Sequence, residues 1–163
     1  MSLTSLAEQI SGSAIGTAIA ESSLAFPIIE GLHLVGLALS VGLLFITDLR
    51  LLNLFLRAVP VEDVLRQLRP WVLGGFALTF ITGILLFWAM ADVLIANPAF
   101  PVKLVFIALA GINALVFEAR LGRRVSEWSA QPVYPRGVRI AAATSLASWS
   151  VVIIAGRLIP YIR

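Results

Sequence analysis

The stretch FPIIEGLHLVGLALSVGLLFITDLR, residues 26–50, places an almost unbroken apolar run around His33, which is the only histidine of the chain. As a helix rising ~1.5 Å per residue, this run is long enough to cross the ~30 Å hydrocarbon core of a bilayer. The whole chain has the same character, because 60% of its residues are hydrophobic and only 13% are charged. Such a composition leaves too little polar surface for a water-soluble globule, so we expect an integral membrane protein.

Three more apolar stretches follow the first one. Backbone groups inside lipid must bond to one another, so each stretch is expected to be helical. The sequence therefore predicts an all-α, polytopic bundle in a single transmembrane domain over residues 1–163, with membrane helices at about 27–52, 71–95, 103–121 and 138–161. Before them, apolar residues interleaved with Ser, Gly and Thr over about 4–21 predict a short helix lying along the membrane interface.

The basic residues are distributed very unevenly along the chain. Nine of the twelve Lys and Arg residues fall in the segments that join the first helix to the second and the third to the fourth: Arg50, Arg57, Arg66, Arg69, Arg120, Arg123, Arg124, Arg136 and Arg139. By the positive-inside rule these two segments are cytoplasmic and both termini are extracytoplasmic. Charges placed as membrane anchors also argue against nucleic acid as a partner, so the lipid bilayer is the expected one.

Ionisable residues fall into two layers, of which the inner one lies near the cytoplasmic boundary. It combines carboxylates and guanidiniums in rough balance: Asp48, Arg50, Arg69, Glu118 and Arg120. Charges at membrane depth need partners, so we interpret this layer as a structural ion network that ties the first three helices together. Cysteine is absent, which excludes disulfides and thiolate metal sites.

The outer layer differs, because it sets three potential cations against one acid and so suits an anionic ligand. A bundle imidazole with apolar walls and nearby basic groups is the arrangement that haem b requires. We therefore expect His33 to be an axial metal ligand, oriented by Glu30, with Gly36 leaving room beside the ring. The full set of expected cofactor-binding residues is His33, Glu30, Gly36, Lys103, Arg157, Tyr161 and Met90, the last as a candidate sixth ligand.

A second reading of the same residues stays open. His33 is then structural and hydrogen-bonds to Glu30 one turn earlier, and the chain is a non-enzymatic membrane subunit or scaffold whose outer cations bind lipid head groups or a partner protein. In either case the many small residues on three of the helices exceed what one bundle can bury. We therefore expect a homo-oligomer.

Four blocks of the chain carry a family resemblance: FPIIEGLHLVGLALSVGLLFITDLRLL, RPWVLGGFALTFITGILLF, NPAFPVKLVFIALAGINALVFEARL and AGRLIPY. In this order, and over nearly the whole chain, they resemble an uncharacterised bacterial four-helix membrane family. That family is distantly similar to the CopD copper-resistance proteins and the HemJ-type protoporphyrinogen oxidases. The resemblance implies a bacterial cytoplasmic (inner) membrane protein of electron-transfer type that binds haem b, with a quinone or porphyrin-type small molecule as partner.

The resemblance to the HemJ-type proteins matches their functional histidine to His33 and the lysine that opens a later helix to Lys103. Residues flanking that lysine differ here, where Ala99, Phe100, Pro101 and Val102 precede it, and the chain has no second histidine. Glu118 stands where the uncharacterised family commonly has histidine. The copper function fits poorly, because Cu(I) prefers clusters of thiolate, thioether or imidazole ligands. Whether the chain is an enzyme is left undecided by these residues.

Overall fold

The computed structural model describes residues 2–131 and 133–162, and this part of the chain is all-helical, without strands. Its elements are α1 (Leu3–Ser11), α2 (Ala14–Ala20), α3 (Ala25–Leu51), α4 (Val61–Ala96), α5 (Ala99–Arg120), the 3₁₀ turn η1 (Gly122–Arg124), α6 (Val125–Trp128) and α7 (Arg136–Leu158). Four helices within the described residues, α3, α4, the continuous stretch from α5 to α6, and α7, are long and apolar enough to cross a membrane. The predicted all-α bundle is confirmed.

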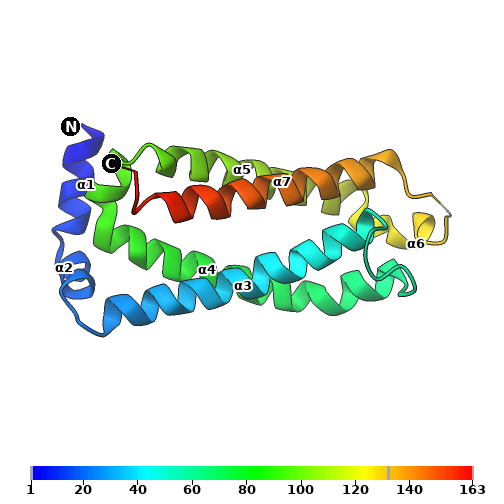
Figure 1. Cartoon of the computed structure of the whole chain (residues 1–163), viewed down its shortest axis with the longest axis horizontal. Helices are drawn as coiled ribbons and strands as arrows, with labels where there is room; N and C mark the ends of the chain where they lie inside the picture. The colour runs from blue at the N-terminus through cyan, green and yellow to red at the C-terminus, as the bar shows by residue number, and fades with distance from the viewer. Residues whose placement is uncertain (1, 132, 163) are drawn as a thin grey trace.

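The four long helices form two closely packed pairs (Figure 1). α3 runs along α4, α5 runs along α7, and α3 also contacts α7, so the pairs join into one elongated bundle. The short helices α1 and α2 lie across one end of this bundle against α4. The indole of Trp88 on α4 holds them there by donating to Ser13 Oγ at 3.0 Å.

The N-terminal segment is helical as predicted, but it is two helices where the sequence predicted one over 4–21. Ser13 is the reason, because its hydroxyl accepts a hydrogen bond from the Gly16 amide at 3.3 Å and so caps a new helix. Ser2 caps α1 in the same way, with the Ser5 amide at 3.2 Å. The break lets the segment turn as it crosses the end of the bundle.

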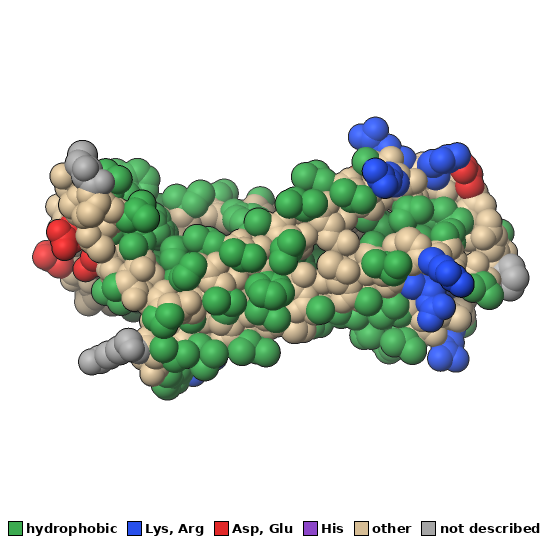
Figure 2. All heavy atoms as spheres, turned by 90° about the horizontal axis from the view of Figure 1, so that it is seen from above, with side chains coloured by type: hydrophobic (Ala, Val, Ile, Leu, Met, Phe, Trp, Pro, Cys, Tyr) green, Lys and Arg blue, Asp and Glu red, His purple; other side chains and the backbone are tan. Residues whose placement is uncertain are grey.

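Apolar side chains cover the outside of the bundle as well as its core. Val41, Ala110, Trp149 and Val152 form a buried central cluster to which α3, α5 and α7 all contribute. Yet Leu34 and Leu115, in the middle of long helices, are 57% and 73% exposed. Figure 2 shows hydrophobic side chains along the length of the bundle, with charged ones at its two ends. A water-soluble protein hides such a surface, whereas lipid solvates it. The chain is therefore a multi-pass membrane protein.

Helix boundaries differ from the prediction at two places. α4 begins at Val61, so the segment up to Pro70 belongs to the second membrane helix. Pro70 removes one backbone donor, and burial of Val61 and Val64 against the core keeps the helix intact across it. α5 begins at Ala99 because the Asn97 side chain accepts from the Ala99 amide at 2.9 Å and starts the helix early.

Candidate functional site

The closest approach of α3 and α4 is built on glycine. A methyl group added to Gly75 would lie 2.7 Å from the Ser40 amide nitrogen, and one added to Gly36 would lie 2.9 Å from the Thr79 amide nitrogen. Both distances are below van der Waals contact, so no side chain larger than hydrogen fits at either position. The two backbones can therefore touch, and their contact fixes which α4 residues face the outer half of α3.

His33 lies in this interface with one ring nitrogen bound to α4. Its Nδ1 is 3.0 Å from the carbonyl oxygen of Thr79 and 3.1 Å from Thr82 Oγ1. A carbonyl only accepts, so Nδ1 carries the hydrogen and donates it. The hydroxyl of Thr82 donates its own hydrogen to the carbonyl of Leu78 at 2.7 Å. The neutral imidazole therefore keeps its unprotonated lone pair on Nε2, the form that binds a metal or accepts a proton.

Two expectations about the surroundings of the ring are wrong. Glu30 is exposed, and among the described residues it makes no hydrogen bond to His33. The imidazole bonds to α4 instead of to a residue of its own helix, α3. Gly36 does not leave room beside the imidazole, since Thr79 occupies the space where its side chain would be. The glycine that borders the ring is Gly83, where an added methyl would lie 3.1 Å from His33 Cε1.

Lys103 lies on the other helix pair, in the half of the bundle nearer α1 and α2. Its side chain lies across α7 at Gly156, where an added methyl would lie 3.5 Å from Lys103 Nζ. The lysine is half-buried. The two residues that the resemblance matched lie in the first third of α3 and of α5, and no hydrogen bond joins them among the described residues.

The other expected outer residues are not part of this cluster. Arg157 Nη2 donates to Tyr161 Oη at 3.0 Å, and its guanidinium lies 5.3 Å from the centre of that ring, so the two exposed side chains bind each other. Met90 has non-helical backbone angles (φ −134°, ψ 27°) and marks a kink in α4. It lies two turns, ~10 Å, beyond Gly83 along the helix. Met90 as a sixth ligand therefore stays a prediction.

The inner layer is joined less completely than predicted. Arg69 and Glu118 form an ion pair that ties α4 to α5. Asp48 and Arg50 are 4% and 5% exposed but take part in none of the ion pairs found among residues 2–131 and 133–162, and neither does the exposed Arg120. Asp48 lies beside Ser145 of α7, and its Oδ2 has no hydrogen-bond partner. Of the five expected residues, the structure pairs two.

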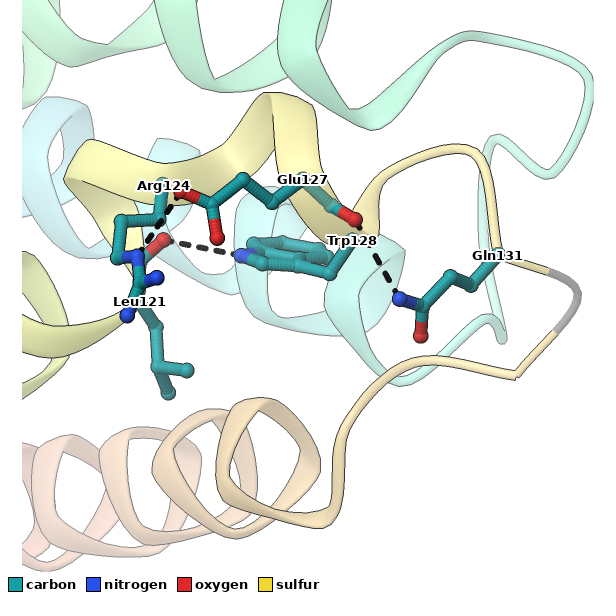
Figure 3. Close-up of polar contacts among 5 residues, drawn as sticks. All are labelled: Leu121, Arg124, Glu127, Trp128 and Gln131. Carbon is teal, nitrogen blue, oxygen red and sulfur yellow. Dashed lines mark hydrogen bonds and ion pairs between the residues drawn. The ribbon is translucent and has the colours of Figure 1, made fainter.

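Side-chain contacts fix the segment that joins α5 to α7. Figure 3 shows the Trp128 indole under α6, donating to the Leu121 carbonyl at 2.9 Å. Arg124 pairs with Glu127 at 3.0 Å, and the Gln131 amide donates to the Glu127 carbonyl at 3.3 Å. These contacts fix where the chain returns to the bundle before α7.

Other polar contacts join the helices where the sequence gives only partial signals. Asn113 donates from Nδ2 to the Ala141 carbonyl at 2.9 Å and links α5 to α7. Thr79, Thr82 and Gly83 form a small and polar stripe on the second helix, but nothing in the sequence assigns it to the imidazole. The bonds from Asn97 Nδ2 to the C-terminal end of α7 had no sequence signal.

The fold and the site define a class: a four-helix membrane bundle with one anchored imidazole and one lysine in the half nearer α1 and α2. Residues 11–162 match the model of a family of unknown function, DUF6644, and the chain belongs to that family. No curated protein and no solved structure matches it.

Proposed function

We propose that this protein binds haem b in the outer half of the bundle, with His33 Nε2 as the axial ligand, and that it acts in electron transfer. The observation that carries the proposal is the hydrogen bond from His33 Nδ1 to the Thr79 carbonyl at 3.0 Å. A backbone carbonyl on the distal ring nitrogen is the usual support of a metal-binding histidine, because it fixes the tautomer and raises the basicity of the ligand. Bound haem would supply a one-electron couple.

The set of available ligands agrees with haem better than with a bare metal ion. Within the described residues, no group of three or more His, Asp or Glu side chains is placed to hold a metal. A haem needs only one protein ligand, since its macrocycle supplies the other four nitrogens. The two pockets found at the α6 end of the bundle do not include His33. The ligand geometry, and not a preformed cavity, therefore carries the proposal.

Lys103 supplies the positive charge that a haem propionate would require. It is half-buried beside Gly156 and takes part in none of the ion pairs found among residues 2–131 and 133–162, so a carboxylate would neutralise its charge. Arg157 is held by Tyr161, so the proposal assigns it no propionate. A quinone or a porphyrin-type molecule remains the proposed redox partner.

The proposal is tested by absorption spectra of the protein produced with a haem precursor. We expect a Soret band in the wild type, its loss in His33→Ala, and weaker haem retention in Lys103→Gln. Thr82→Val removes one acceptor from the imidazole and should shift the reduction potential while keeping the pigment. The matched control is Leu34→Ala, which truncates the next residue of α3 on its exposed face and should leave the spectrum unchanged. A Soret band that survives His33→Ala would overturn the proposal.

A second function is favoured by the same hydrogen bonds, which also tie α3 to α4. In that account His33 is structural, and the protein is a non-enzymatic membrane subunit. His33→Gln separates the two accounts when its amide nitrogen replaces Nδ1 as a donor to Thr79. If His33 is structural, His33→Gln should keep the thermal stability of the wild type. If His33 binds haem, the same variant should lose the pigment.

We also propose the orientation and the assembly. The end of the bundle that carries α6 is cytoplasmic and both termini are outside in a bacterial inner membrane, because nine of twelve basic residues lie at that end. Gly36, Gly75 and Gly83 are used within the chain, whereas added methyl groups at Gly31 and Gly42 would meet nothing within 4 Å. These outward small residues support close packing against a second copy.

A further inference from the structure

A pocket of about 450 Å³ opens at the end of the bundle opposite His33, between the C-terminal end of α3, the loop after it and the start of α7. Its volume falls within the ~300–1,000 Å³ of small-molecule sites. Three arginines line it, Arg50, Arg57 and Arg139, together with polar groups of Asn53, Gln131 and Tyr134. No carboxylate is among the described residues that line it.

Arg50 is the buried member of this pocket and is held firmly. Its side chain reaches back to the loop, where Nε donates to the Val59 carbonyl at 2.9 Å. The guanidinium lies 5.6 Å from the centre of the Tyr134 ring. The residue is only 5% exposed, yet Nη1 has no hydrogen-bond partner. Nη1 is itself buried and does not face the pocket, but the guanidinium as a whole is a fixed positive charge in the pocket wall.

No acidic residue neutralises the three arginines. The ion pairs found in residues 2–131 and 133–162 involve Arg66, Arg69 and Arg124, and none of the pocket arginines. Asp48 lies two positions before Arg50, but it sits beside Ser145 and does not pair with Arg50. The three positive charges of these arginines around one pocket therefore favour an anion with several acceptor oxygens.

We propose that this pocket binds a phosphate group, which the guanidiniums of Arg50, Arg57 and Arg139 hold together. Planar guanidiniums match the oxygens of a phosphate in pairs, which explains why all three cations are arginines. The phosphate belongs either to the head group of an anionic phospholipid or to a free phosphate compound. The position of the pocket, where the apolar α3 ends and basic side chains gather (Figure 2), is the depth at which head groups lie. The proposal is independent of haem binding.

The arrangement of the surrounding chain supports a built site. The loop after α3 contains two residues with left-handed backbone angles, Asn53 (φ 58°) and Leu56 (φ 49°), and neither is glycine. Such a conformation is uncommon for a leucine and is maintained here while the loop presents the Val59 carbonyl to Arg50. On the other side, the edge of the Trp128 ring packs against Tyr134 at 5.3 Å between centres. The contacts of Figure 3 fix Trp128. Trp128 in turn positions the Tyr134 ring, against which the Arg50 guanidinium lies.

The test uses the full chain in neutral detergent, with native mass spectrometry to measure binding of dioleoylphosphatidylglycerol and dioleoylphosphatidylcholine. We expect the wild type to prefer the anionic lipid. The double variant Arg57→Gln/Arg139→Gln should bind that lipid about tenfold or more weakly, because it loses two charge-assisted contacts. Both substituted residues are exposed, so folding is preserved. The control Arg123→Gln/Arg136→Gln removes the same charge at the same end, outside the pocket, and should bind like the wild type.

A second arm distinguishes the source of the phosphate. Thermal unfolding is measured in sodium phosphate and in sodium chloride at equal ionic strength. A free phosphate compound is supported if phosphate raises the Tm of the wild type and of the control but not that of Arg57→Gln/Arg139→Gln. A lipid head group is supported if the wild type prefers the anionic lipid and phosphate does not raise its Tm. Arg50→Lys keeps the positive charge but loses the planar set of guanidinium donors. It should therefore weaken the binding of whichever probe the wild type binds. The proposal is overturned if neither probe binds the wild type, or if the pocket variant and the control behave alike.

Discussion

Gly75 and its neighbour Gly74 offer a matched test of how α3 and α4 are held together. A methyl group at position 75 would lie 2.7 Å from the Ser40 amide nitrogen and 3.0 Å from its Cα, whereas one at position 74 would meet nothing within 4 Å. Both substitutions to alanine improve helix propensity by ~1 kcal/mol, so this gain cancels between them. Only Gly75→Ala must push two backbones apart, by roughly an ångström, to restore ordinary ~3.5–4.0 Å contact.

The expected difference follows from the cost of overpacking, which is ~1–3 kcal/mol in well-packed interiors. Gly75→Ala should therefore be less stable than Gly74→Ala by that amount, and it should also loosen the bond between His33 and Thr79 that the crossing holds in place. The assay is reversible unfolding in mixed micelles with a rising fraction of sodium dodecyl sulfate, followed by far-ultraviolet circular dichroism. Equal stability of the two variants would refute the close crossing of α3 and α4.

Three other predictions concern the rest of the bundle. Asn113→Leu should lower the free energy of unfolding by ~0.6–2 kcal/mol in the same assay, because it removes the 2.9 Å bond to Ala141 between α5 and α7; an unchanged midpoint would contradict that role. Arg69→Gln should cost no more than ~1 kcal/mol, since its ion pair with Glu118 is partly exposed, and a larger loss would show that the pair is essential to the fold. A periplasm-active reporter fused to the C-terminus should be active, and activity of a cytoplasmic reporter there would reverse the orientation.

The membrane helices could be predicted from the sequence because lipid imposes one requirement on every spanning segment. A run of apolar residues long enough to cross must satisfy its backbone internally, and hydropathy alone reveals it. The boundaries were harder. Pro70 suggested a helix start, but the buried Val61 and Val64 extend α4 nine residues before it, from position 61. Burial of a residue at a helix end depends on neighbours that local patterns do not contain.

The hydrogen-bond partners of His33 could not be predicted from the sequence, for a related reason. Spacing along one helix favoured Glu30, three positions earlier, as the residue that orients the ring. The actual partners, Thr79 and Thr82, lie on another helix, and they reach the ring only because Gly36 and Gly75 allow the two backbones to touch. Helical periodicity identifies faces but does not say which faces meet. The small and polar stripe on α4 was the one available signal.

The inner layer shows the same limit in charge pairing. Two acids and three guanidiniums at one depth, in rough balance, suggested a network, yet only Arg69 and Glu118 pair. Arg50 instead turns to the Val59 carbonyl and the Tyr134 ring, because the loop after α3 folds back over it. Depth in the membrane was readable from the sequence, whereas direction around each helix was not.

The central claim is that His33 Nε2 is held ready for the iron of a haem, and the most direct test is the haem content of the purified wild-type protein. The protein would be produced with excess haem precursor, extracted under mild conditions, and assayed as its pyridine haemochromogen against protein concentration. One haem b per chain is expected, since one anchored imidazole provides one axial ligand. A colourless, folded protein from haem-replete cells would contradict the claim and leave His33 as a residue that joins α3 to α4.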